Sequence, residues 1–512
     1  MSRPPAPTPR PVRRVTPAAA SAWPLHGTAA SRRIEQQAQQ ALPAHTLMQR
    51  AGAAVAQLAL ALAPHARRIW VACGPGNNGG DGLEAAMHLR RAGRPVQVSL
   101  LGDPARLPAD ARASLQRAQE AGVPVGPDPL PPADARPGDL AIDALLGLGS
   151  SRAPEGVLAQ AVAELRQWPG TVLCVDLPTG LAADTGQLPG GTERAVHGHH
   201  TLSLLTLKPG LFTASGRDCA GQVWFDDLDV HDDAAPDAWL CAREDAPPAR
   251  RHAQHKGSFG DVLVLGGATG MTGAALLAGR AAIAAGAGRV FVSPLGEAPL
   301  ALDPQAPELM LRDADHAAAL DWSTLTVTCG CGGGTAVRAV LPKALGSAGR
   351  LVLDADALNA IAADPMLQSL LEARGRRGAP TVLTPHPLEA ARLLALDGAQ
   401  AVQRDRLGAA RALSERYRCV VVLKGSGSVI AAAGEAPWIN LSGNAALATA
   451  GTGDVLAGWL AGLWSQGLEA LPAARLAVHT HGAAADAWVA AHARPGPLTA
   501  SRLIGLLAGD AP

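Results

Sequence analysis

The stretch RIWVACGPGNNGGDGLEAAMHLRRAG, residues 68–93, decides the fold of the first half of the chain. It opens with an apolar run over residues 68–74 that is long enough for one buried strand, and residues 82–93 have the spacing of a helix. The glycines and asparagines between these two segments favour a tight turn. A strand, a turn and a helix in this order predict one βα unit of a parallel sheet.

The same pattern continues on both sides of this unit. Apolar residues recur at helical spacing over residues 31–64 with a break near Pro43, which predicts two amphipathic helices. Three more apolar runs are short enough to be buried strands, at residues 95–102, 139–147 and 171–180. We therefore expect a doubly wound α/β domain, in which ligands bind beyond the carboxyl ends of the strands.

A second βα series follows a stretch that has no periodicity. Residues 226–251 are rich in Asp, Pro and Ala, which makes them the best candidate for a linker. Beyond them, strands are expected within residues 260–270, 324–334, 350–361, 380–394 and 419–432, and a long terminal helical region is expected after residues 451–463. The predicted organisation is a disordered tail over 1–20, an α/β domain over 21–228, a linker over 229–252 and a second doubly wound α/β domain over 253–512.

Composition excludes several classes of function. The 44 basic residues balance the 44 acidic ones, and no basic stripe with interleaved aromatic residues occurs, which argues against a nucleic-acid partner. No apolar run approaches the roughly 20 residues of a membrane-spanning helix. The Pro- and Arg-rich start lacks the apolar core of a signal peptide. We therefore expect a cytoplasmic enzyme for small molecules, with targeting to an organelle as the alternative.

Lysine and cysteine usage adds two observations. Only four of the 44 basic residues are lysines, Lys208, Lys256, Lys343 and Lys424. Three of them precede Gly or Pro-Gly, and an ammonium is not interchangeable with a guanidinium, so specific roles are expected unless these lysines are chance survivors. The seven cysteines are scattered, and a metal or disulfide site is not indicated.

The first candidate site lies in ACGPGNNGGDG, residues 72–82. Backbone amides in such a turn, at the start of a helix, can bind an anion. Asp81 fits poorly beside a bare phosphate and better beside a ligand hydroxyl or amide; the alternative is a purely structural turn. Asp176, at the end of an apolar strand, is the best candidate for general acid and base catalysis, with capping of the next turn as its alternative.

The second candidate site combines two glycine-rich turns. Lys424 lies in LKGSGSVI (423–430), between two expected strands, and GTGD (451–454) stands immediately before an expected helix. Amides at that helix start can bind an anion, and Asp454 can accept a proton from a hydroxyl. This combination predicts phosphoryl transfer to an alcohol. His386 lies between two prolines and is a candidate ligand contact, with a structural turn as the alternative.

The first half resembles the N-terminal domain of the bifunctional NAD(P)H-hydrate repair enzymes through NNGGDG, LMQRAG (47–52), DALLGLGSSRAP (143–154) and VDLPTG (175–180). The resemblance implies a Rossmann-like fold that interconverts the R and S hydrates of NADH and NADPH, called NADHX and NADPHX, with a potassium ion in the site. It implies substrate contacts at Asn77, Asn78, Gly79, Gly80, Asp81, Gly147, Leu148, Gly149, Ser150, Ser151, Arg152, Ala153 and the catalytic Asp176.

The same resemblance implies that Asn78, Asp143 and Thr179 hold the potassium ion. An amide, a carboxylate and a hydroxyl supply the oxygen ligands that a hard cation prefers. Thr179 stands where the family more often has Ser, and Gln49 stands where it tends to have Glu. Residues 31–33, Ser-Arg-Arg, replace an expected Asp.

The second half resembles ribokinase-like kinases through GTGD, and TPHPLEAARLL (384–394), GCGGG (330–334) and HKGSFG (255–260) narrow the match to the C-terminal NAD(P)H-hydrate dehydratase domain. The resemblance implies a nucleotide, ADP in bacterial members and ATP in eukaryotic ones, with Mg²⁺. The nucleotide phosphorylates the hydrate hydroxyl, and loss of phosphate restores the nicotinamide ring.

Residue by residue, this resemblance places the nucleotide against Lys424, Gly425, Ser426, Gly427, Ser428, Asn444, Gly451, Thr452 and Gly453. Asp454 would be the base, and Ala274, Gly332 and His386 would line the substrate side. Leu388 replaces a usual Gly, and Cys331 and Gly333 replace Pro and Leu.

Two rival functions are weighed against dinucleotide repair. A ribokinase-like kinase for a vitamin precursor, such as a hydroxymethylpyrimidine or hydroxyethylthiazole, would also carry GTGD, but it would lack the fused NNGGDG domain and the TPHP segment. A non-catalytic binding module would not need Asp143, Asp176 and Asp454. We expect a homo-oligomeric repair enzyme that gives AMP and phosphate from ADP.

Overall fold

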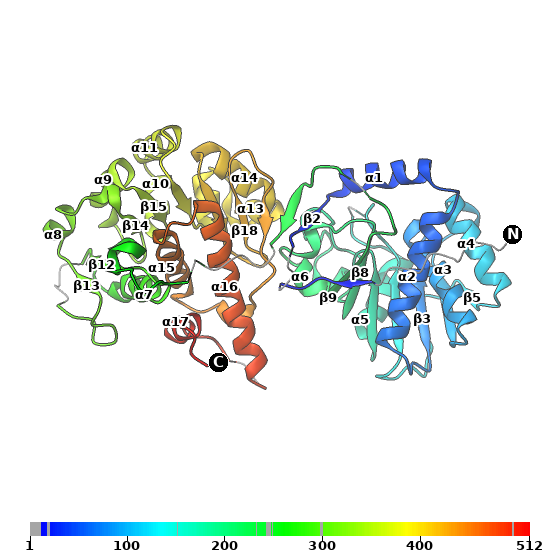
Figure 1. The fold of residues 1–512 in the computed structure, drawn as a ribbon. Coiled ribbons are helices and arrows are strands. Elements are labelled where there is room, and N and C mark those ends of the chain that lie inside the picture. The colour runs from blue at the N-terminus through cyan, green and yellow to red at the C-terminus, as the bar shows by residue number, and fades with distance from the viewer. Residues whose placement is uncertain are drawn as a thin grey trace. The chain divides into compact units, whose positions relative to one another are not determined.

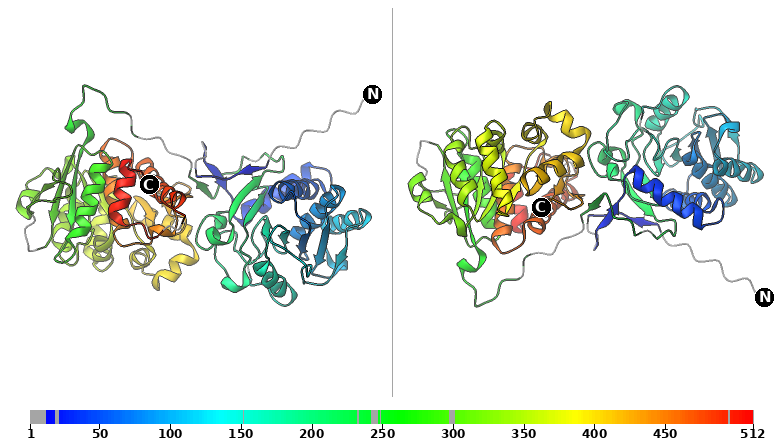
Figure 2. Two further views of the ribbon diagram at one scale, coloured as in Figure 1. Left: turned by 90° about the horizontal axis from the view of Figure 1, so that it is seen from below. Right: turned by 90° about the horizontal axis from the view of Figure 1, so that it is seen from above.

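The chain divides into two compact units, one ending at Ala238 and the other continuing from Trp239. The computed structural model describes residues 12–17, 21–150, 152–231, 233–241, 247, 249–296, 301–493 and 496–511. Each unit is a sheet with helices on both faces (Figures 1 and 2). The division falls within the linker predicted over 229–252, although β10 (Ala238–Leu240) in this stretch is a strand.

The sheet of the first unit is parallel except at one edge. Its order is β1 (Arg13–Arg14), β9 (Gln222–Asp226), β8 (His200–Leu204), β7 (Thr171–Val175), β6 (Leu140–Ala144), β3 (Ile69–Cys73), β4 (Val96–Leu100) and β5 (Val125–Gly126). β1 runs antiparallel to β9. The predicted disordered tail therefore contains a paired strand at residues 13–14, whereas residues 1–11 and 18–20 lie outside the described residues.

Alternation along β3 divides the core of this unit between two faces. Ile69, Val71 and Cys73 pack in one cluster with α2 to α4, whereas Trp70 and Ala72 pack in another with α5. Successive strand residues point to opposite faces, so a run that is apolar throughout requires helices on both. The helices and remaining strand are α1 (Thr28–Ala41), α2 (Thr46–Leu62), α3 (Asn77–Arg91), α4 (Ala109–Glu120), α5 (Val157–Gln167), α6 (Gly216–Cys219) and β2 (Trp23–Leu25).

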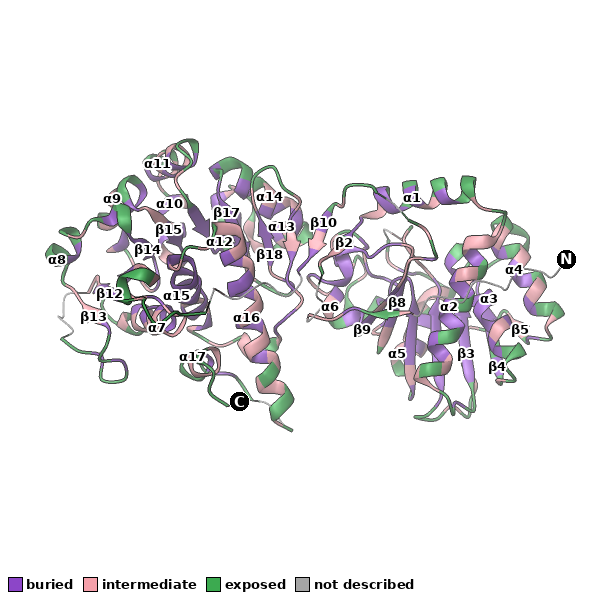
Figure 3. Cartoon of the chain, viewed as in Figure 1, coloured by how far each residue is buried: buried purple, intermediate pink, exposed green. Residues whose placement is uncertain are grey.

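The sheet of the second unit is parallel in its centre and antiparallel near one end. Its order is β13 (Met310–Leu311), β12 (Arg289–Pro294), β11 (Asp261–Gly266), β14 (Thr326–Cys329), β15 (Arg350–Leu353), β16 (Thr381–Leu383), β17 (Val420–Leu423), β18 (Val429–Ala431), β19 (Trp438–Ile439) and β10. β18 pairs antiparallel with both β17 and β19. The central strands are buried and the outer helix faces are exposed (Figure 3).

Helices cover both faces of this second sheet. They are α7 (Thr272–Ala284), α8 (Ala314–Ala318), α9 (Val337–Ser347), α10 (Ala355–Ala362), α11 (Pro365–Arg376), α12 (Pro387–Leu393), α13 (Gly398–Arg404), α14 (Arg406–Tyr417), α15 (Thr452–Ser465), α16 (Ala470–Ala491) and α17 (Ala500–Ala508). Val262 and Val264 of β11 share one core cluster with α7 and α15. Within the described chain, every helix is too short or too polar to cross a lipid bilayer.

The doubly wound prediction is correct in both halves, but two helix starts differ. α3 begins at Asn77 rather than at residue 82, so the NNGGD segment is the first turn of the helix. Likewise, α15 begins at Thr452, inside GTGD. The seven cysteines are all free and buried.

Two glycines let α15 approach α7 closely. A Cβ on Gly458 would lie 1.9 Å from the carbonyl oxygen of Ala278, and one on Gly462 would lie 2.3 Å from that of Ala282. Neither distance is compatible with a side chain, so the helices would have to separate.

Gly458→Ala is therefore expected to destabilise the second unit by about 1–3 kcal/mol, because overpacking forces backbone shifts. The matched control is Gly346→Ala in α9, where a Cβ meets no atom within 4 Å and should be neutral or stabilising. Denaturant midpoints of the two variants and the parent chain test this. Equal midpoints for both variants would show that the close helix contact carries no such constraint.

Candidate active sites

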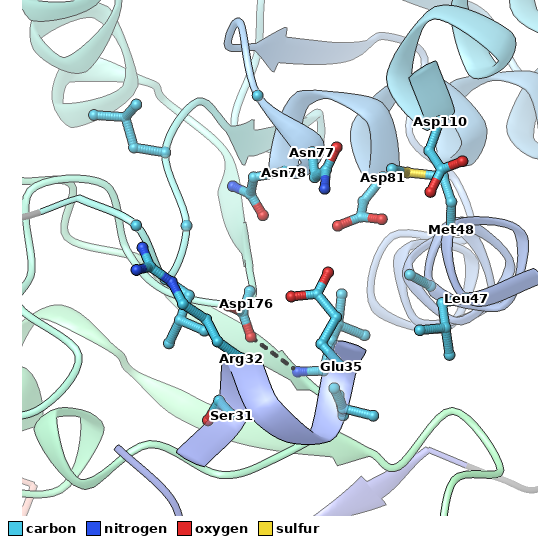
Figure 4. Close-up of a pocket in the computed structure, with 18 of the residues that line it drawn as sticks. Ser31, Arg32, Glu35, Leu47, Met48, Asn77, Asn78, Asp81, Asp110 and Asp176 are labelled. Carbon is cyan, nitrogen blue, oxygen red and sulfur yellow. Dashed lines mark hydrogen bonds between the residues drawn. The ribbon is translucent and has the colours of Figure 1, made fainter. Parts of the chain in front are cut away.

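A cavity of about 430 Å³ lies in the first unit beyond the carboxyl ends of β3, β6 and β7. The loops after these strands line it, together with α1 and α2 (Figure 4). β3 and β6 are neighbours in the sheet, and the chain leaves them in opposite directions, towards β4 and β7. Such a switch point opens a crevice between the two loops, which explains the position of the cavity.

The first turn of α3 contributes polar side chains to this cavity. Asn77, Asn78 and Asp81 line it. Gly79 and Gly80 do not: a Cβ on Gly79 would lie 2.0 Å from the carbonyl oxygen of Gly74, and one on Gly80 would lie 2.8 Å from the end of the Met48 side chain. These two glycines therefore permit the close packing of the helix, and the other three residues face the ligand space.

The loop after β6 supplies the next wall of the cavity. Of the predicted stretch, Gly147, Leu148, Gly149 and Ser150 line it, whereas Arg152 and Ala153 are not among the lining residues and Ser151 lies outside the described residues. A Cβ on Gly147 would lie 3.2 Å from the Asn78 amide group. The loop thus packs directly against the start of α3.

Asp176 is held at the cavity wall by a buried lysine. It follows β7 with φ 65°, in the left-handed region, and its N–H donates to the carbonyl of Leu202 (2.8 Å). The ammonium of Lys208 donates to its carboxylate and, at 2.7 Å, to the carbonyl of Leu204. Lys208 is only 2% exposed. Sequence reasoning noted Lys208 as a rare lysine but did not place it in the site.

Two further carboxylates share this space with Asp176. The side chains of Glu35 and Asp81 point towards one another in the cavity (Figure 4). Burial raises the pKa of Asp81 well above its usual value, and the charges of Asp176 and Glu35 raise it further. Burial, followed by the charge of Asp176, also raises the pKa of Glu35. Both groups therefore retain a proton more readily than an exposed carboxylate, and Glu35 supplies an acid that the sequence analysis missed.

The three residues assigned to potassium lie at the same edge of the sheet. Asp143 is fully buried; its two oxygens accept the Thr179 hydroxyl (2.7 Å) and the Thr179 N–H (2.8 Å). Burial raises the pKa of Asp143. The Nδ2 of Asn78 is buried without a hydrogen-bond partner in the described chain. The Asp143 carboxylate, which has no counter-ion among the described residues, and the Thr179 hydroxyl are oxygen donors that fit a potassium ion. Asn78 would add only its Oδ1, because an NH₂ group does not bind a cation.

The centre of the second site is an ion pair between Lys424 and Asp354. Lys424 follows β17, and its Nζ donates to Oδ1 of Asp354 at 2.6 Å. Asp354 follows β15 and also accepts the Thr384 hydroxyl (2.8 Å). Burial opposes the ammonium charge, but the carboxylates of Asp354 and Glu389 together raise the pKa of Lys424 above its usual value. Asp354 was not predicted as a site residue.

Asp454 joins this cluster from the first turn of α15. A carboxylate oxygen of Asp454, one of Asp354 and Sγ of Cys331 lie within 4.8 Å of one another. A Cβ on Gly453 would lie 3.5 Å from Nζ of Lys424. Burial raises the pKa of Asp454 to about 6, with the charge of Asp354 adding to the rise. The structure therefore brings Lys424 and Asp454 together, and the Asp454 carboxyl group changes protonation near pH 6.

The KGSGS loop is held from behind by Arg406. This residue is 1% exposed, and its Nη2 donates to the carbonyls of Leu423 (3.3 Å), Lys424 (3.3 Å) and Gly427 (3.4 Å). A Cβ on Gly425 would lie 2.8 Å from the guanidinium. The predicted residues Ser426 and Ser428 lie in the same turn between β17 and β18. Arg406 is a further positioning residue that the sequence did not reveal.

The GTGD turn is fixed from α16. Gly451 has φ 86° and precedes α15, and the Thr452 hydroxyl donates to the carbonyl of Leu447 (2.9 Å). Nε2 of His481 lies 2.9 Å from the carbonyl oxygen of Thr452. Burial lowers the pKa of His481 to about 4, so the ring is neutral and donates this hydrogen bond. Asn444 is held by the Asp486 carboxylate (2.8 Å).

Of the three residues predicted on the substrate side, two lie next to each other and the third caps a helix. Ala274 and Gly332 are adjacent, since a Cβ on Gly332 would lie 2.8 Å from that of Ala274. His386 caps α12, because its Nδ1 accepts the N–H groups of Leu388 (3.1 Å) and Glu389 (3.3 Å). The structural alternative for His386 is therefore observed, while contact with a ligand stays a prediction. Burial raises the pKa of Glu389 to about 7.

Known proteins match both halves of the chain. Residues 44–210 match a family described as YjeF-related protein N-terminus, and residues 262–506 match the NAD(P)H-hydrate dehydratase family. The bifunctional NAD(P)H-hydrate repair enzyme Nnr of Escherichia coli K12 is 36% identical over 463 residues, which cover 87% of this chain and 85% of that protein. The protein of that name from Coxiella burnetii is 36% identical over 456 residues, covering 86% and 90%.

The chain belongs to the family of bifunctional NAD(P)H-hydrate repair enzymes. Among solved structures, the ADP/ATP-dependent NAD(P)H-hydrate dehydratase of Bacillus subtilis, co-crystallized with ATP/Mg²⁺, is 29% identical. It covers 51% of this chain and 92% of its own length, with a TM-score of 0.42.

In this member of the repair-enzyme family, the functional residues that the sequence analysis missed have one thing in common. Their important neighbours are distant in the sequence. Ion pairs or hydrogen bonds of this kind are made by Lys208, Asp354, Arg406 and His481. Glu35 instead faces Asp81 and Asp176 across the cavity. Only Lys208 carried a signal, the scarcity of lysine. The others stand in segments whose own pattern predicts nothing more than a helix or a strand end.

The buried His481 predicts a loss of stability in acid. Its folded-state pKa of about 4 lies below the usual 6.5, so the unfolded chain takes up the proton first and unfolding is favoured as pH falls through this window. This protonation lowers the free energy of unfolding by about 2–3 kcal/mol between pH 7 and pH 4.5. His481→Gln should lose correspondingly less stability over this range than the parent chain.

Denaturant midpoints at pH 7 and 4.5 for both proteins give this difference. Glu389 acts in the opposite sense, because its raised pKa of about 7 destabilises the folded state at higher pH, but it is present in both proteins and cancels. Equal losses in the two proteins would contradict the assignment of a neutral, buried imidazole.

Proposed function

We propose that this chain repairs hydrated nicotinamide dinucleotides in two steps, one in each unit. The first unit interconverts R and S NADHX and NADPHX, and the second dehydrates the S form to NADH or NADPH while ADP is converted to AMP and phosphate. The observation that carries the proposal is the cluster of Lys424, Asp354 and Asp454 at the glycine-rich start of α15. The cytoplasmic location and homo-oligomeric state stay predictions.

The dehydration is a phosphoryl transfer followed by an elimination. Asp454 removes the proton of the hydrate hydroxyl, whose oxygen then attacks the terminal phosphorus of the nucleotide. Lys424 and the N–H groups at the start of α15 offset the negative charge on the phosphoryl oxygens. The ring nitrogen lone pair then expels phosphate from C6, and loss of a proton from C5 restores the double bond. Because the pKa of Asp454 is about 6, it is ionised at neutral pH and able to act as the base.

A Mg²⁺ ion bound with the nucleotide would further neutralise the phosphates. Mg²⁺ is held by one or two carboxylates together with phosphate oxygens. The nearest carboxylates to the Lys424 loop are those of Asp354 and Asp454. Since Asp454 has to remain free to take a proton, we assign Asp354 to this role. The Cys331 thiol, whose pKa is raised by burial, is a poor ligand for a hard ion.

Epimerisation in the first unit is a proton-assisted exchange at C6. A protonated carboxyl group gives its proton to the hydroxyl, which leaves as water while the ring nitrogen forms a C=N bond. Water then adds to the opposite face and returns the proton. Asp176, Asp81 and Glu35 line the cavity, and the raised pKa values of Asp81 and Glu35 suit them as proton donors. Asp176, held by Lys208, would stabilise the positive ring.

We also propose that Asn78, Asp143 and Thr179 hold the potassium ion. Support comes from their oxygen donors and from the buried, uncompensated carboxylate of Asp143. A monovalent cation there would remove the cost of burying that charge and would order the loop that carries Gly147.

A direct assay tests whether the dehydratase uses ADP or ATP. The protein is incubated with mixed hydrate epimers and either nucleotide, and recovery of the reduced nicotinamide is followed by its absorbance together with free phosphate. Recovery with free phosphate supports repair, and faster recovery with ADP supports the bacterial preference. A stable phosphate ester without recovered absorbance would instead support the kinase alternative.

Asp454→Asn is expected to abolish dehydration and leave epimerisation intact. Loss of a general base lowers the rate about 10²- to 10⁴-fold. In the parent chain, dehydratase kcat/KM should rise with pH up to about 6, where Asp454 ionises, and then level off. The R-to-S rate of the variant, followed by chromatography of the epimers, is the internal control. Full dehydratase turnover in the variant would remove Asp454 from the mechanism.

Asp176→Asn is expected to stop enzymatic epimerisation while the spontaneous rate and the dehydratase activity persist. The variant leaves the Lys208 ammonium buried without its partner, which costs about 3–5 kcal/mol if it cannot relax. The double variant Asp176→Asn/Lys208→Met removes both charges and serves as a stability control. An Asp176→Asn protein that melts like the parent and still epimerises would exclude Asp176 from catalysis.

A further inference from the structure

The cavity of the first unit is lined by more acidic than basic side chains. Its lining includes four carboxylates, from Glu35, Asp81, Asp110 and Asp176. Only two cationic side chains line it within the described chain, Arg32 and Lys208. The ammonium of Lys208 is bound to Asp176 at the buried end of the cavity, so its charge is already compensated.

Arg32 is the remaining cation, and it stands on the face of α1 that borders the cavity. Glu35 and Gln39 follow it at helical spacing and line the same cavity. Its Nη2 lies 3.4 Å from the position of a Cβ on Gly149, so the guanidinium reaches the loop after β6 (Figure 4). Within the described chain, Arg32 has neither a hydrogen bond nor an ion pair, and its side chain is exposed.

The proposed substrates make such a cation necessary. Their pyrophosphate carries two negative charges, and the 2′-phosphate of the NADPH form adds roughly −1.5 to −2 at neutral pH. Those carboxyl groups of the lining that are ionised repel these charges unless a cation meets the phosphate at the point of contact. A guanidinium binds phosphate oxygens through two parallel N–H groups and stays charged at all working pH values. Arg32 supplies such a guanidinium with no competing partner in the described chain, whereas the ammonium of Lys208 is already paired with Asp176.

We infer that Arg32 is the phosphate-binding residue of the first unit and that it clamps a phosphate group of the dinucleotide against the Gly149 loop. This inference rests on the proposed epimerase function and names the part of the substrate that α1 recognises. The phosphate groups do not change during epimerisation, so this contact stabilises substrate and transition state equally. Its loss therefore raises KM and leaves kcat nearly unchanged.

The test compares three variants in the full-length protein. Arg32→Gln removes both the positive charge and the two parallel N–H groups, and Arg32→Lys keeps the charge alone. Arg33→Gln is the matched control. Arg33 is the next residue of the same helix; it is exposed, and it does not line the cavity. Initial R-to-S rates above the spontaneous background are measured against substrate concentration for NADHX and NADPHX separately, at low and high salt.

Arg32→Gln is expected to raise KM about tenfold, which corresponds to 1.4 kcal/mol, with Arg32→Lys intermediate and Arg33→Gln at the parent value. High salt should raise the KM of the parent towards that of Arg32→Gln, because the contact is screened. A rise for both substrates identifies the pyrophosphate, and a rise for NADPHX alone identifies the 2′-phosphate.

The charge of Arg32 also lowers the pKa of the neighbouring Glu35, in opposition to burial. A variant that changes kcat and its pH profile but not KM would therefore show that Arg32 acts through Glu35, and it would overturn the inference. Equal KM values for Arg32→Gln and Arg33→Gln would do the same. An inactive parent protein would refute the proposed epimerase function itself, and the dehydratase activity of each variant checks that the second site is unaffected.

Discussion

A lysine ammonium bound to a buried carboxylate at a strand end is the interaction on which each site depends. Lys208 binds Asp176 in the first unit, and Lys424 binds Asp354 in the second. Each pair joins residues from two different strand ends or loops, so it fixes their relative positions. Removing one partner would leave the other charge without a counter-ion and poorly solvated, which costs far more folding stability than removing both. The chain retains only four lysines, and two of them serve in these pairs.

The βα series, the division into two units and the strand-end positions of the sites are predictable from sequence, because buried parallel strands produce short apolar runs that end in Asp and Gly. The same patterns place Asp176 and Asp454 at strand and helix ends. They do not reveal Glu35 or Asp354, whose importance comes from neighbours distant in the sequence, such as Lys424, which is 70 residues from Asp354. The family resemblance predicted that all five residues of NNGGD contact the ligand. In the structure, Gly79 and Gly80 permit helix packing, and only the polar residues face the cavity.

The close spacing of carboxyl groups determines how many of them are protonated in each site. Asp81 and Glu35 surround the Asp176 pair in one unit, and Asp454 and Glu389 surround the Asp354 pair in the other. With a single paired lysine in each cluster, not all of these groups can ionise together, so some keep a proton near neutral pH. In the proposed reactions, acid and base are thereby supplied by one residue type through burial and neighbouring charge, while His481 is a neutral, buried imidazole.

The burial of every thiol has a consequence for the conditions under which the protein can work. Sulfur reacts with peroxides, disulfides and alkylating reagents as the thiolate, and burial raises the pKa of thiols such as Cys219, to about 11, and Cys329, to about 12. The folded chain therefore presents almost no nucleophilic sulfur to oxidants. An enzyme whose task is to restore damaged redox cofactors is in this way insulated from the oxidative chemistry that threatens exposed cysteine enzymes.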